Sequence, residues 1–591
     1  MKPTRTFDLL DRYIQQFPDA QALSAKVNGT WTFYSGKQYH ETAHFIACGL
    51  LKLGLKKGDK ILTVSNNRPE WNFVDMGMAM VGIVHVPVYT SMNEEQYNYI
   101  LKHSDACMAI VSDASLHAHI KAASKGVKGL QEIYSFDEME GVRHWMEIVD
   151  TGKACAHELL ETVESLKSSI AEDDLASLIY TSGTTGVSKG VMLSHRNLVS
   201  NFLAATEVFK LGPGDRYLSI LPLCHVGGRM GNYQTQYSGA CIYYAESMGT
   251  IAANLKEIKA TGFDAVPRIL EKVFDTVMAK GRALNGMKKR IFFWAVKLGL
   301  RYKAFGANGW LYEQKLKIAD KLIFSKWRDA LGGQARIVGC GGASLPPRIE
   351  RVFWAAGLKI LNMYGLTETS PIITINRQHK ELCKLGSVGA LIEGVELKIA
   401  DDGEILCRGE NVMLGYYKDD ALTKSVIDEE GWFHTGDVGH LEDGKFLMIT
   451  DRKKEIFKLS NGKYVAPQPI ENRIKESEFV DQVMVTGEGQ KFASALVVPD
   501  FNSLTEWSKS QNLPSAKDPG ELVCMPDIKA LFNKEFIKLN KTLSEPERIQ
   551  GFRIVSEAWT PDTGELSASL KLRRKFIEDK NRALLDSIYR R

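Results

Sequence analysis

The spacing of apolar residues in the first 110 positions predicts helices that alternate with short strands. One helical pattern ends near Leu50, and the apolar run 60–64 then predicts a strand. A second helical stretch, over 70–80, leads into another apolar run at 82–89. Strands that alternate with helices favour parallel pairing, so we expect α/β layers built on largely parallel sheets.

The pattern changes further along the chain. The α/β alternation continues to about residue 380, and short apolar runs between glycine-rich turns at 386–450 then predict a compact β subdomain. A fresh β/α pattern begins after 450. We therefore predict an α/β protein with a large N-terminal domain of layered α/β subdomains and a small mobile α+β lid. The predicted boundaries are 1–450 for the N-terminal domain (β subdomain about 386–450), 451–454 for a hinge and 455–591 for the C-terminal lid domain.

Composition and charge narrow the class of protein. The 591 residues are 44% apolar and 25% charged, which excludes collagen-like, coiled-coil and disordered chains. A net charge of +4 is too balanced to indicate nucleic-acid binding. No apolar run of about 18 residues predicts a membrane span, and the N-terminus lacks the apolar core of a signal peptide. Nine scattered cysteines without a CxxC pair favour reduced thiols, so we expect a cytoplasmic enzyme.

One basic segment modifies this picture. Residues 276–312 contain no acidic side chain, but they contain eight Lys and Arg residues interleaved with Phe292, Phe293 and Trp294. A basic amphipathic helix can lie on an anionic membrane surface, whereas a solvated helix with its apolar side in the core gives the same pattern. Both interpretations stay open, and so does peripheral contact with a membrane.

The segment 180–190 (YTSGTTGVSKG) is rich in glycine and hydroxyl residues and lies between two apolar runs. Its glycines and hydroxyl residues supply a flexible loop with many N–H and O–H donors. Such a loop can wrap around phosphate oxygens, with Lys189 as a point charge. The segment is not a Walker A motif, because Ser188 precedes the lysine and Gly190 follows it.

Five segments in order resemble signatures of the adenylate-forming superfamily, which includes acyl-CoA synthetases, luciferases and peptide-synthetase adenylation domains. The loop 180–190 resembles its phosphate-binding signature, and 364–370 (YGLTETS) resembles its YGxTE motif. The segment 435–437 (TGD) resembles the ribose-binding motif, and 451–454 (DRKK) resembles the hinge. The segment 565–574 (ELSASLKLRR) resembles the one that carries the catalytic lysine, although the family usually shows Thr or Pro near its serines. The resemblance covers essentially the whole chain.

The resemblance implies a site for ATP and Mg²⁺, with CoA as co-substrate. Glu368 would hold Mg²⁺ with assistance from Thr184, and Thr367 would bond the α-phosphate. The ring of Tyr364 would lie against adenine, whose edge would pass close to the backbone around Gly342. The implied nucleotide-binding residues are Thr181, Ser182, Gly183, Thr184, Thr185, Gly186, Lys189, Gly341, Gly342, Ala343, Asn362, Met363, Tyr364, Gly365, Thr367, Asp437, Arg452 and Lys454.

The chemistry explains why such residues are needed. A carboxylate is a poor electrophile, but attaching AMP turns one oxygen into a leaving group that a thiol can displace. This step needs positive charge on the phosphates and a bridging metal. The resemblance places Lys571 between the carboxylate and the α-phosphate during adenylation. Rotation at Lys454 would then present Lys458 in a second, thioester-forming state.

The segment 221–229 (LPLCHVGGR) indicates the class of acid substrate, because it resembles the LPLxHxxxR segment of long-chain fatty acyl-CoA synthetases. It implies a catalytic and substrate-binding role for His225, and substrate contacts for Val226 and Arg229. Gly228 stands where some members of the family carry glutamate, which leaves the gate geometry open. Burying about 14 methylenes would contribute roughly 11 kcal/mol before ordering costs, which favours an enclosed channel for a long tail.

The predicted reaction converts a long-chain fatty acid, ATP and CoA into acyl-CoA, AMP and pyrophosphate. Two alternatives share the chemistry: a medium-chain or aryl acid–CoA ligase, and a fatty acyl-AMP ligase that transfers to a carrier protein. A non-enzymatic lipid-binding scaffold is disfavoured, because it would not need Lys189, Glu368, Asp437, Arg452 and Lys571 together. We expect small-molecule partners and no nucleic acid; membrane contact through 276–312 and a homodimer are left open.

Overall fold

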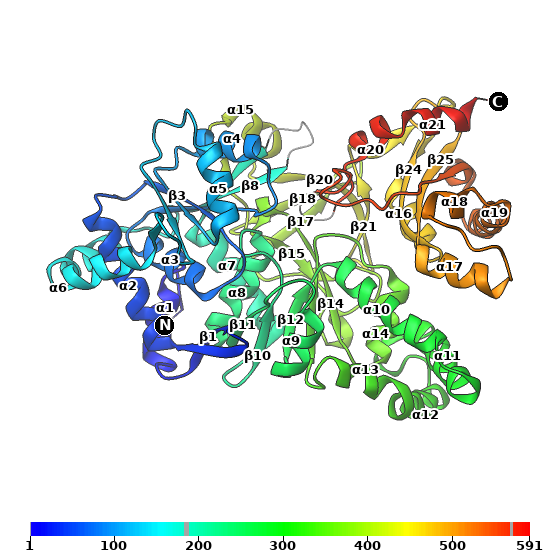
Figure 1. Cartoon of the computed structure of the whole chain (residues 1–591), viewed down its shortest axis with the longest axis horizontal. Helices are drawn as coiled ribbons and strands as arrows, with labels where there is room; N and C mark the ends of the chain where they lie inside the picture. The colour runs from blue at the N-terminus through cyan, green and yellow to red at the C-terminus, as the bar shows by residue number, and fades with distance from the viewer. Residues whose placement is uncertain (1, 183–187, 568–570, 591) are drawn as a thin grey trace. The chain divides into compact units, whose positions relative to one another are not determined.

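The computed structural model describes residues 2–182, 188–567 and 571–590. The predicted phosphate-binding residues Gly183, Thr184, Thr185 and Gly186 therefore lie outside the described residues. The chain divides into two compact units (Figure 1). Unit 1 comprises Met1–Gly342, Ile349–Leu397 and Cys407–His434, and unit 2 comprises Ala343–Arg348, Lys398–Leu406 and Thr435–Arg591.

One sheet of unit 1 has eight strands and is mainly parallel. Its strands are β3 (Lys60–Val64), β4 (Val84–Val88), β5 (Met108–Val111), β6 (Glu132–Ser135), β7 (Arg143–His144), β8 (Leu175–Ser182), β9 (Ser188–Ser194) and β19 (Gly415–Tyr416). They pair in the order β19-β9-β8-β4-β3-β5-β6-β7. The last pairs at one edge, β8 with β9 and β9 with β19, are antiparallel.

A second sheet of unit 1 has nine strands, with a parallel centre and antiparallel edges. Its strands are β1 (Gln21–Val27), β2 (Thr30–Ser35), β10 (Arg216–Ser219), β11 (Cys241–Tyr244), β12 (Gly262–Ala265), β13 (Ile337–Cys340), β14 (Ile360–Gly365), β15 (Ile372–Ile375) and β16 (Ala390–Leu391). They pair in the order β16-β15-β14-β13-β12-β10-β11-β1-β2. The two sheets confirm the predicted α/β class.

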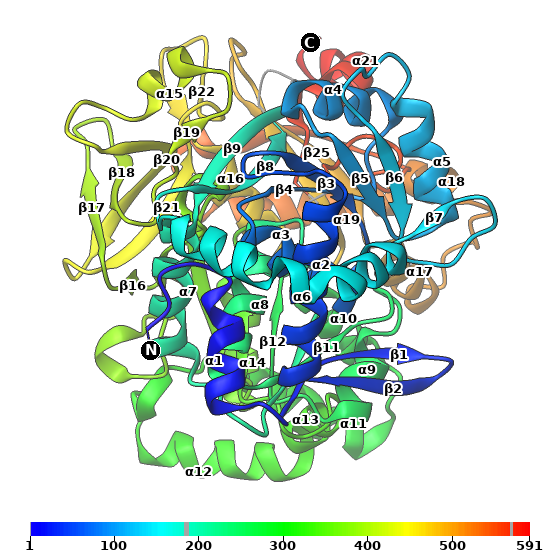
Figure 2. The ribbon, with the colours of Figure 1, turned by 90° about the vertical axis from the view of Figure 1, so that its left-hand side faces the viewer.

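Helices connect and cover these strands (Figure 2). They are α1 (Asp8–Gln16), α2 (Gly36–Lys52), α3 (Pro69–Met80), α4 (Glu94–Ser104), α5 (Ala114–Ala123), α6 (Met146–Ser169), α7 (His195–Phe209), α8 (Val226–Ser238), α9 (Ile251–Ile258), α10 (Pro267–Arg282), α11 (Gly286–Leu300), α12 (Trp310–Ala319), α13 (Ser325–Ala330), α14 (Pro347–Ala355) and α15 (Asp420–Val426). The helix α2 starts at a capping box in which Ser35 and Gln38 satisfy each other's backbone N–H groups. It packs against both α3 and α6. Among the described residues, no helix has the length and apolar character that a membrane crossing requires.

Four further strands form a sheet of their own, β17 (Val395–Ile399), β18 (Glu404–Gly409), β20 (Phe433–Glu442) and β21 (Phe446–Arg452), in the order β17-β18-β20-β21. The remaining strands belong to unit 2: β22 (Phe457–Lys458), β23 (Tyr464–Val465), β24 (Val480–Thr486), β25 (Ala493–Pro499) and β26 (Ile549–Ile554). The helices of this unit are α16 (Pro467–Ile474), α17 (Phe501–Ser510), α18 (Pro519–Cys524), α19 (Pro526–Asn540), α20 (Arg574–Lys580) and α21 (Arg582–Tyr589).

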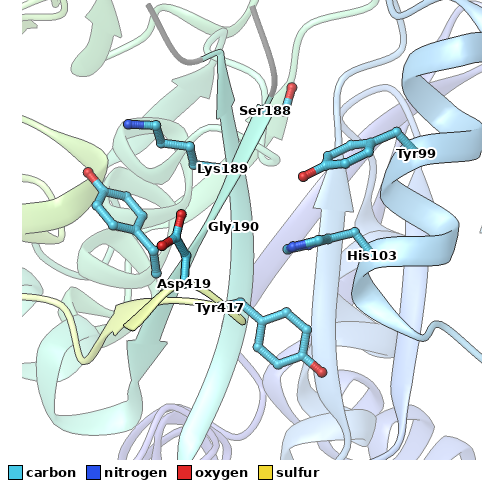
Figure 3. Close-up of a pocket in the computed structure, with 8 residues that line it drawn as sticks. Tyr99, His103, Ser188, Lys189, Gly190, Tyr417 and Asp419 are labelled. Carbon is cyan, nitrogen blue, oxygen red and sulfur yellow. The ribbon is translucent and has the colours of Figure 1, made fainter. Parts of the chain in front are cut away.

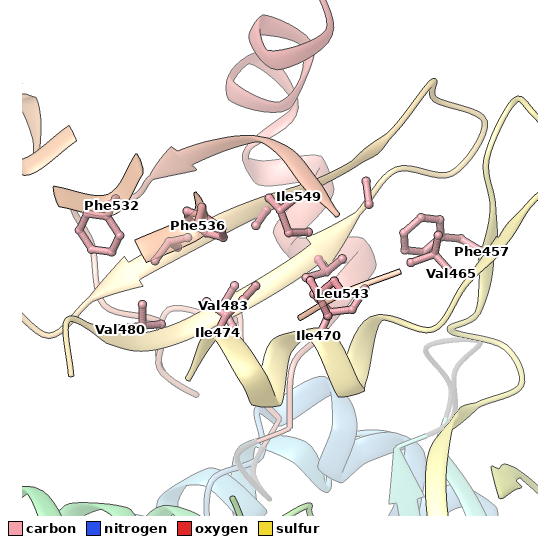
Figure 4. Close-up of a cluster of buried hydrophobic side chains, with 14 of the residues drawn as sticks. Phe457, Val465, Ile470, Ile474, Val480, Val483, Phe532, Phe536, Leu543 and Ile549 are labelled. Carbon is pink, nitrogen blue, oxygen red and sulfur yellow. The ribbon is translucent and has the colours of Figure 1, made fainter. Parts of the chain in front are cut away.

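The alternation of side chains along β25 builds two cores in unit 2. Ala495 and Val497 join a cluster with Phe532 and Phe536 of α19 (Figure 4). Their neighbour Leu496 joins a second cluster with Ile577 of α20, together with residues of α21. Successive residues of a strand point to opposite faces, so β25 is covered on both sides. The predicted limits of the hinge and lid stay predictions.

A buried carboxyl on α14 predicts an unusual dependence of stability on pH. Glu350 is fully buried, and the backbone N–H of Gly386 donates to its Oε2 at 2.7 Å. Burial raises the pKa of Glu350 to about 8, because the charged form loses its hydration. The folded protein therefore holds a proton that the unfolded chain releases above its ordinary pKa of 4.5.

We expect this carboxyl to contribute stability fully below pH 4.5 and to lose that contribution as pH rises towards 8. At 1.36 kcal/mol per pKa unit, the loss is on the order of 3–5 kcal/mol. The variant Glu350→Gln cannot titrate and its amide oxygen can still accept from Gly386. Urea unfolding from pH 5 to 9 should show the variant gaining stability relative to wild type as pH rises. Parallel curves for the two proteins would contradict this assignment.

Candidate active site

The predicted phosphate loop is carried by a β-hairpin. Strands β8 and β9 pair with Thr181 opposite Lys189 and Tyr180 opposite Gly190. A Cβ atom at Gly190 would lie 2.9 Å from Cδ1 of Leu178, so the strand packs where a side chain does not fit without a shift. Lys189 therefore lies in β9 close to the connection 183–187, and this connection is outside the described residues.

The residues predicted to hold adenine lie where β13 and β14 end. These strands are parallel, with Cys340 opposite Asn362. A Cβ atom at Gly341 would lie 2.8 Å from Cγ of Met363, so glycine permits the close approach of the two strands. Ligands of α/β sheets bind at the carboxyl ends of the strands, which is where Tyr364 and its neighbours are found. Gly342 follows with φ at +84°, a conformation that favours glycine.

The carboxylate predicted to hold Mg²⁺ is joined to the hairpin through a residue that the sequence analysis missed. Glu368 lies in a short 3₁₀ turn (Thr367–Thr369) directly after β14. The hydroxyl of Tyr416, on β19, donates to Oε1 of Glu368 at 2.8 Å. The Nζ atom of Lys189 lies 5.2 Å from the centre of the same tyrosine ring. The structure therefore brings together Lys189 and Glu368, which are 179 positions apart, through Tyr416.

A cavity of about 120 Å³ opens beside Lys189 (Figure 3). Tyr99 and His103 project into it from α4. Their rings stack with centroids 5.2 Å apart, and Nδ1 of His103 lies 2.8 Å from the hydroxyl of Tyr180. Burial lowers the pKa of His103, so its ring favours the neutral form. Aromatic rings, the ammonium of Lys189 and the carboxylate of Asp419 therefore line this cavity.

The segment predicted to bind the acid forms the start of α8. His225 caps the helix, with its Nδ1 accepting from the N–H of Gly227 at 3.0 Å. Val226 is buried in the core. Arg229 is 2% exposed, and its guanidinium is held by protein groups throughout.

Arg229 belongs to a buried network of charged and polar groups. Its Nη2 lies 2.5 Å from Oδ1 of Asp75 on α3. Its Nε donates to the hydroxyl of Tyr233 at 2.8 Å, and Nη1 to Oγ of Ser177 at 2.5 Å. The same Asp75 oxygen lies 2.6 Å from Nδ1 of His85 on β4. The guanidinium and His85 hold the pKa of Asp75 below its ordinary value against the effect of burial. These contacts fix α8 against α3, and a contact of Arg229 with substrate stays a prediction.

The residues predicted to bind ribose meet on adjacent strands of unit 2. Asp437 on β20 stands opposite Arg452 on β21, with Nε of the arginine 3.2 Å from Oδ1 of the aspartate. Asp437 is 5% exposed, and its backbone N–H donates to Oγ1 of Thr435 at 3.1 Å. The glycine between them has φ at +71°, which makes the turn of the TGD segment. An oriented carboxylate of this kind can accept hydrogen bonds from a diol.

The predicted lysines of unit 2 are all exposed. Lys571 and Ser567 exchange two hydrogen bonds. The Ser567 N–H donates to the Lys571 carbonyl at 2.8 Å, and the Lys571 N–H donates to Oγ of Ser567 at 3.1 Å. Lys454 follows β21, and Lys458 lies on β22 with Nζ 5.4 Å from the centre of the Tyr464 ring. These lysines offer charge that is accessible to a ligand, and their catalytic roles stay predictions.

Comparison with known proteins identifies the class. The model of the AMP-binding enzyme family matches residues 10–417, and that of the AMP-binding enzyme C-terminal domain matches 454–591. The chain belongs to the AMP-binding enzyme family.

Individual relatives extend the match over the whole chain. A long-chain-fatty-acid–CoA ligase of Mycobacterium bovis, FadD15, is 33% identical over 97% of this chain and 95% of its own. Long-chain-fatty-acid–CoA ligase 1 of Homo sapiens is 30% identical over 99% of this chain and 86% of its own.

Solved structures share the fold. The adenylation domain of a carboxylate reductase from Mycobacterium chelonae superimposes with a TM-score of 0.75 at 21% identity, covering 99% of this chain and 91% of that one. The o-succinylbenzoate CoA synthetase of Bacillus subtilis, in complex with ATP and magnesium ion, gives a TM-score of 0.67 at 19% identity over 97% and 99% of the two chains.

Proposed function

We propose that this protein is an AMP-forming ligase that joins a long-chain fatty acid to CoA. The observation that carries the proposal is the 33% identity over 97% of the chain to a long-chain-fatty-acid–CoA ligase. The reaction has two steps. The acid first attacks the α-phosphate of ATP and releases pyrophosphate, and the CoA thiol then displaces AMP from the acyl-adenylate.

The residues of unit 1 would bind the phosphates and the metal. Lys189, next to the connection of the β8–β9 hairpin, supplies positive charge, and Thr367 supplies a hydroxyl for the α-phosphate. Among the described residues, no group of three acidic, His or Cys side chains is placed to hold a metal. Mg²⁺ in nucleotide enzymes is held by one or two carboxylates plus phosphates and water, so Glu368 alone fits such an ion. When bound, the ion would neutralise charge on the phosphates during adenylation.

The residues of unit 2 would serve the sugar and the reacting groups. Asp437, oriented by Arg452, would accept hydrogen bonds from the ribose hydroxyls. Lys571 would stabilise the negative charge that develops between the carboxylate and the α-phosphate. After adenylation, a backbone rotation at Lys454 would withdraw Lys571 and present Lys458 for thioester formation. His225 would orient the carboxylate at the first turn of α8.

The class of acid and acceptor is tested with a substrate panel. Pyrophosphate release is measured with palmitate, octanoate and benzoate, each with and without free CoA. We expect palmitate to give the highest kcat/KM, and acyl-CoA and AMP to form in equal amounts when CoA is present. Preference for octanoate or benzoate would favour a medium-chain or aryl ligase. Adenylation that CoA cannot complete would favour transfer to a carrier protein.

We also propose that an anionic bilayer is the partner of the surface of α11 and α12 (Figure 1). Trp310 is 71% exposed and Leu311 is 70% exposed, and Met287 on the adjacent helix is also largely exposed. The basic residues of 276–312 surround these apolar side chains along the sequence. Apolar side chains that insert beside lysines and arginines match the interface of anionic lipids. A homodimer stays a prediction.

The double variant Trp310→Ser/Leu311→Ser tests this surface. We expect its partitioning onto vesicles of phosphatidylcholine and phosphatidylglycerol to fall at least about tenfold, since each apolar side chain contributes roughly 1.5–3 kcal/mol when buried. Met248→Ser, which changes an apolar residue that is 61% exposed elsewhere in unit 1, is the control. Equal flotation of the wild type and the double variant with the vesicles would exclude this surface as the site of membrane binding.

A further inference from the structure

Tyr416 contacts both of the groups that the proposed function assigns to the triphosphate and its metal. Its hydroxyl donates to Oε1 of Glu368 at 2.8 Å, and its ring faces the Lys189 ammonium with 5.2 Å between Nζ and the ring centre. The side chain is 5% exposed. Both contacts lie within unit 1, so the arrangement does not depend on where the lid stands.

The backbone around Tyr416 ties the same two elements together. The N–H of Met413 donates to the carbonyl of Glu368 at 2.9 Å, and the N–H of Tyr417 donates to the carbonyl of Gly190 at 2.8 Å. Between these ends, β19 pairs with β9, with Tyr416 opposite Val191. The segment 413–417 is therefore hydrogen-bonded to Glu368 at one end and to the β8–β9 hairpin at the other. These bonds fix the position of Tyr416 between the two.

The hydroxyl and the ring of Tyr416 act differently. The hydroxyl of Tyr416 donates its proton to one oxygen of the Glu368 carboxylate, which it approaches to 2.8 Å. A carboxylate with one oxygen held in this way keeps its orientation, as partners of metal ligands generally ensure. The face of the ring attracts the ammonium of Lys189. Tyr416 thus contacts Lys189 with its ring and Glu368 with its hydroxyl.

We propose that Tyr416 is a positioning residue for adenylation, which orients Glu368 towards the divalent cation and holds Lys189 apart for the phosphates. The inference rests on the proposed function, because it takes Glu368 as the ligand of the metal. It adds to that function a residue that binds neither substrate nor metal directly.

Binding of Mn²⁺, measured by electron paramagnetic resonance with α,β-methylene-ATP, tests the proposal. Tyr416→Phe keeps the ring and removes the hydroxyl. We expect it to weaken Mn²⁺ binding by about 10–100-fold, the usual effect of removing a partner of a metal ligand. The Mg²⁺ concentration that gives half-maximal ATP–pyrophosphate exchange should rise by the same factor. Tyr417→Phe is the matched control, because it removes a neighbouring hydroxyl that donates to Oδ2 of Asp105 at 3.0 Å; its Mn²⁺ affinity should stay within about twofold of wild type.

A double-mutant cycle separates this inference from the function on which it rests. In a Glu368→Gln background, Tyr416→Phe should have no further effect on Mn²⁺ binding, since its effect passes through the carboxylate. Unchanged Mn²⁺ binding by Tyr416→Phe, alongside weakened binding by Glu368→Gln, overturns the role of Tyr416 alone. Unchanged binding by Glu368→Gln overturns the metal assignment, and the inference with it. Melting temperatures of all variants, compared with wild type, show whether the fold is retained.

Discussion

Replacing Lys571 with alanine should lower acyl-adenylate formation by about 10²–10³-fold or more, while thioester formation from supplied acyl-adenylate continues. The lysine is exposed on unit 2 and would meet the carboxylate and α-phosphate only in the adenylating state. The loss therefore falls on the first half-reaction. ATP–pyrophosphate exchange measures that step, and acyl-CoA formation from synthetic palmitoyl-adenylate measures the second.

Lys575→Ala is the matched control for this prediction. Lys575 is an exposed lysine of the same basic stretch, at the start of α20. Its replacement should leave both half-reactions unchanged. The contrary result would be that Lys571→Ala loses both half-reactions equally while keeping the melting temperature of wild type. The proposal that Lys571 serves adenylation but not thioester formation would then be wrong.

Replacing Asp75 with alanine should lower the free energy of unfolding by about 3–5 kcal/mol, because it leaves a buried charge without its partner. Arg229 is 2% exposed, and Asp75 supplies its nearest counter-charge at 2.5 Å. The same change removes the partner of Nδ1 of His85. Urea unfolding at pH 7 measures the loss.

An exposed ion pair provides the comparison for Asp75. Glu257→Ala breaks the surface pair of Glu257 with Lys26, whose atoms lie 2.8 Å apart. Such pairs contribute about 0–1 kcal/mol, so this variant should unfold close to wild type. A loss for Asp75→Ala as small as that for Glu257→Ala would show that the network does not hold α8 in place.

Individual helices and strands were predictable because the spacing of apolar residues within each segment indicates its structure. The run 60–64 is β3, the helical stretch 70–80 is α3 (Pro69–Met80), and the run 82–89 contains β4 (Val84–Val88). Each is a continuous apolar run or a helical pattern buried in unit 1, and such patterns reflect burial directly. Gly341 and Gly342 were predicted from the family resemblance, and the structure adds the physical reason: a close approach at Gly341 and a positive φ at Gly342.

The interactions that the sequence did not reveal connect distant segments. Tyr416 acquires its contacts only because β19 pairs with β9, more than 220 positions earlier. No periodicity records such a pairing. Asp75 lies in an almost wholly buried helix, where nothing local distinguishes an aspartate that faces Arg229 from one that faces solvent. The ion pair of Arg229 with Asp75 also joins distant segments, so the motif that predicts a substrate contact for Arg229 does not reveal it.

The protein makes a fatty acid reactive by attaching AMP to it. A single turnover with α-³²P-labelled ATP, ¹⁴C-labelled palmitate and Mg²⁺, in the absence of CoA, tests whether this adenylation takes place. We expect one enzyme-bound product that carries both labels, together with pyrophosphate, and its conversion to acyl-CoA and labelled AMP when CoA is added. Labelled ADP, or a nucleotide product whose formation does not require palmitate, would contradict it.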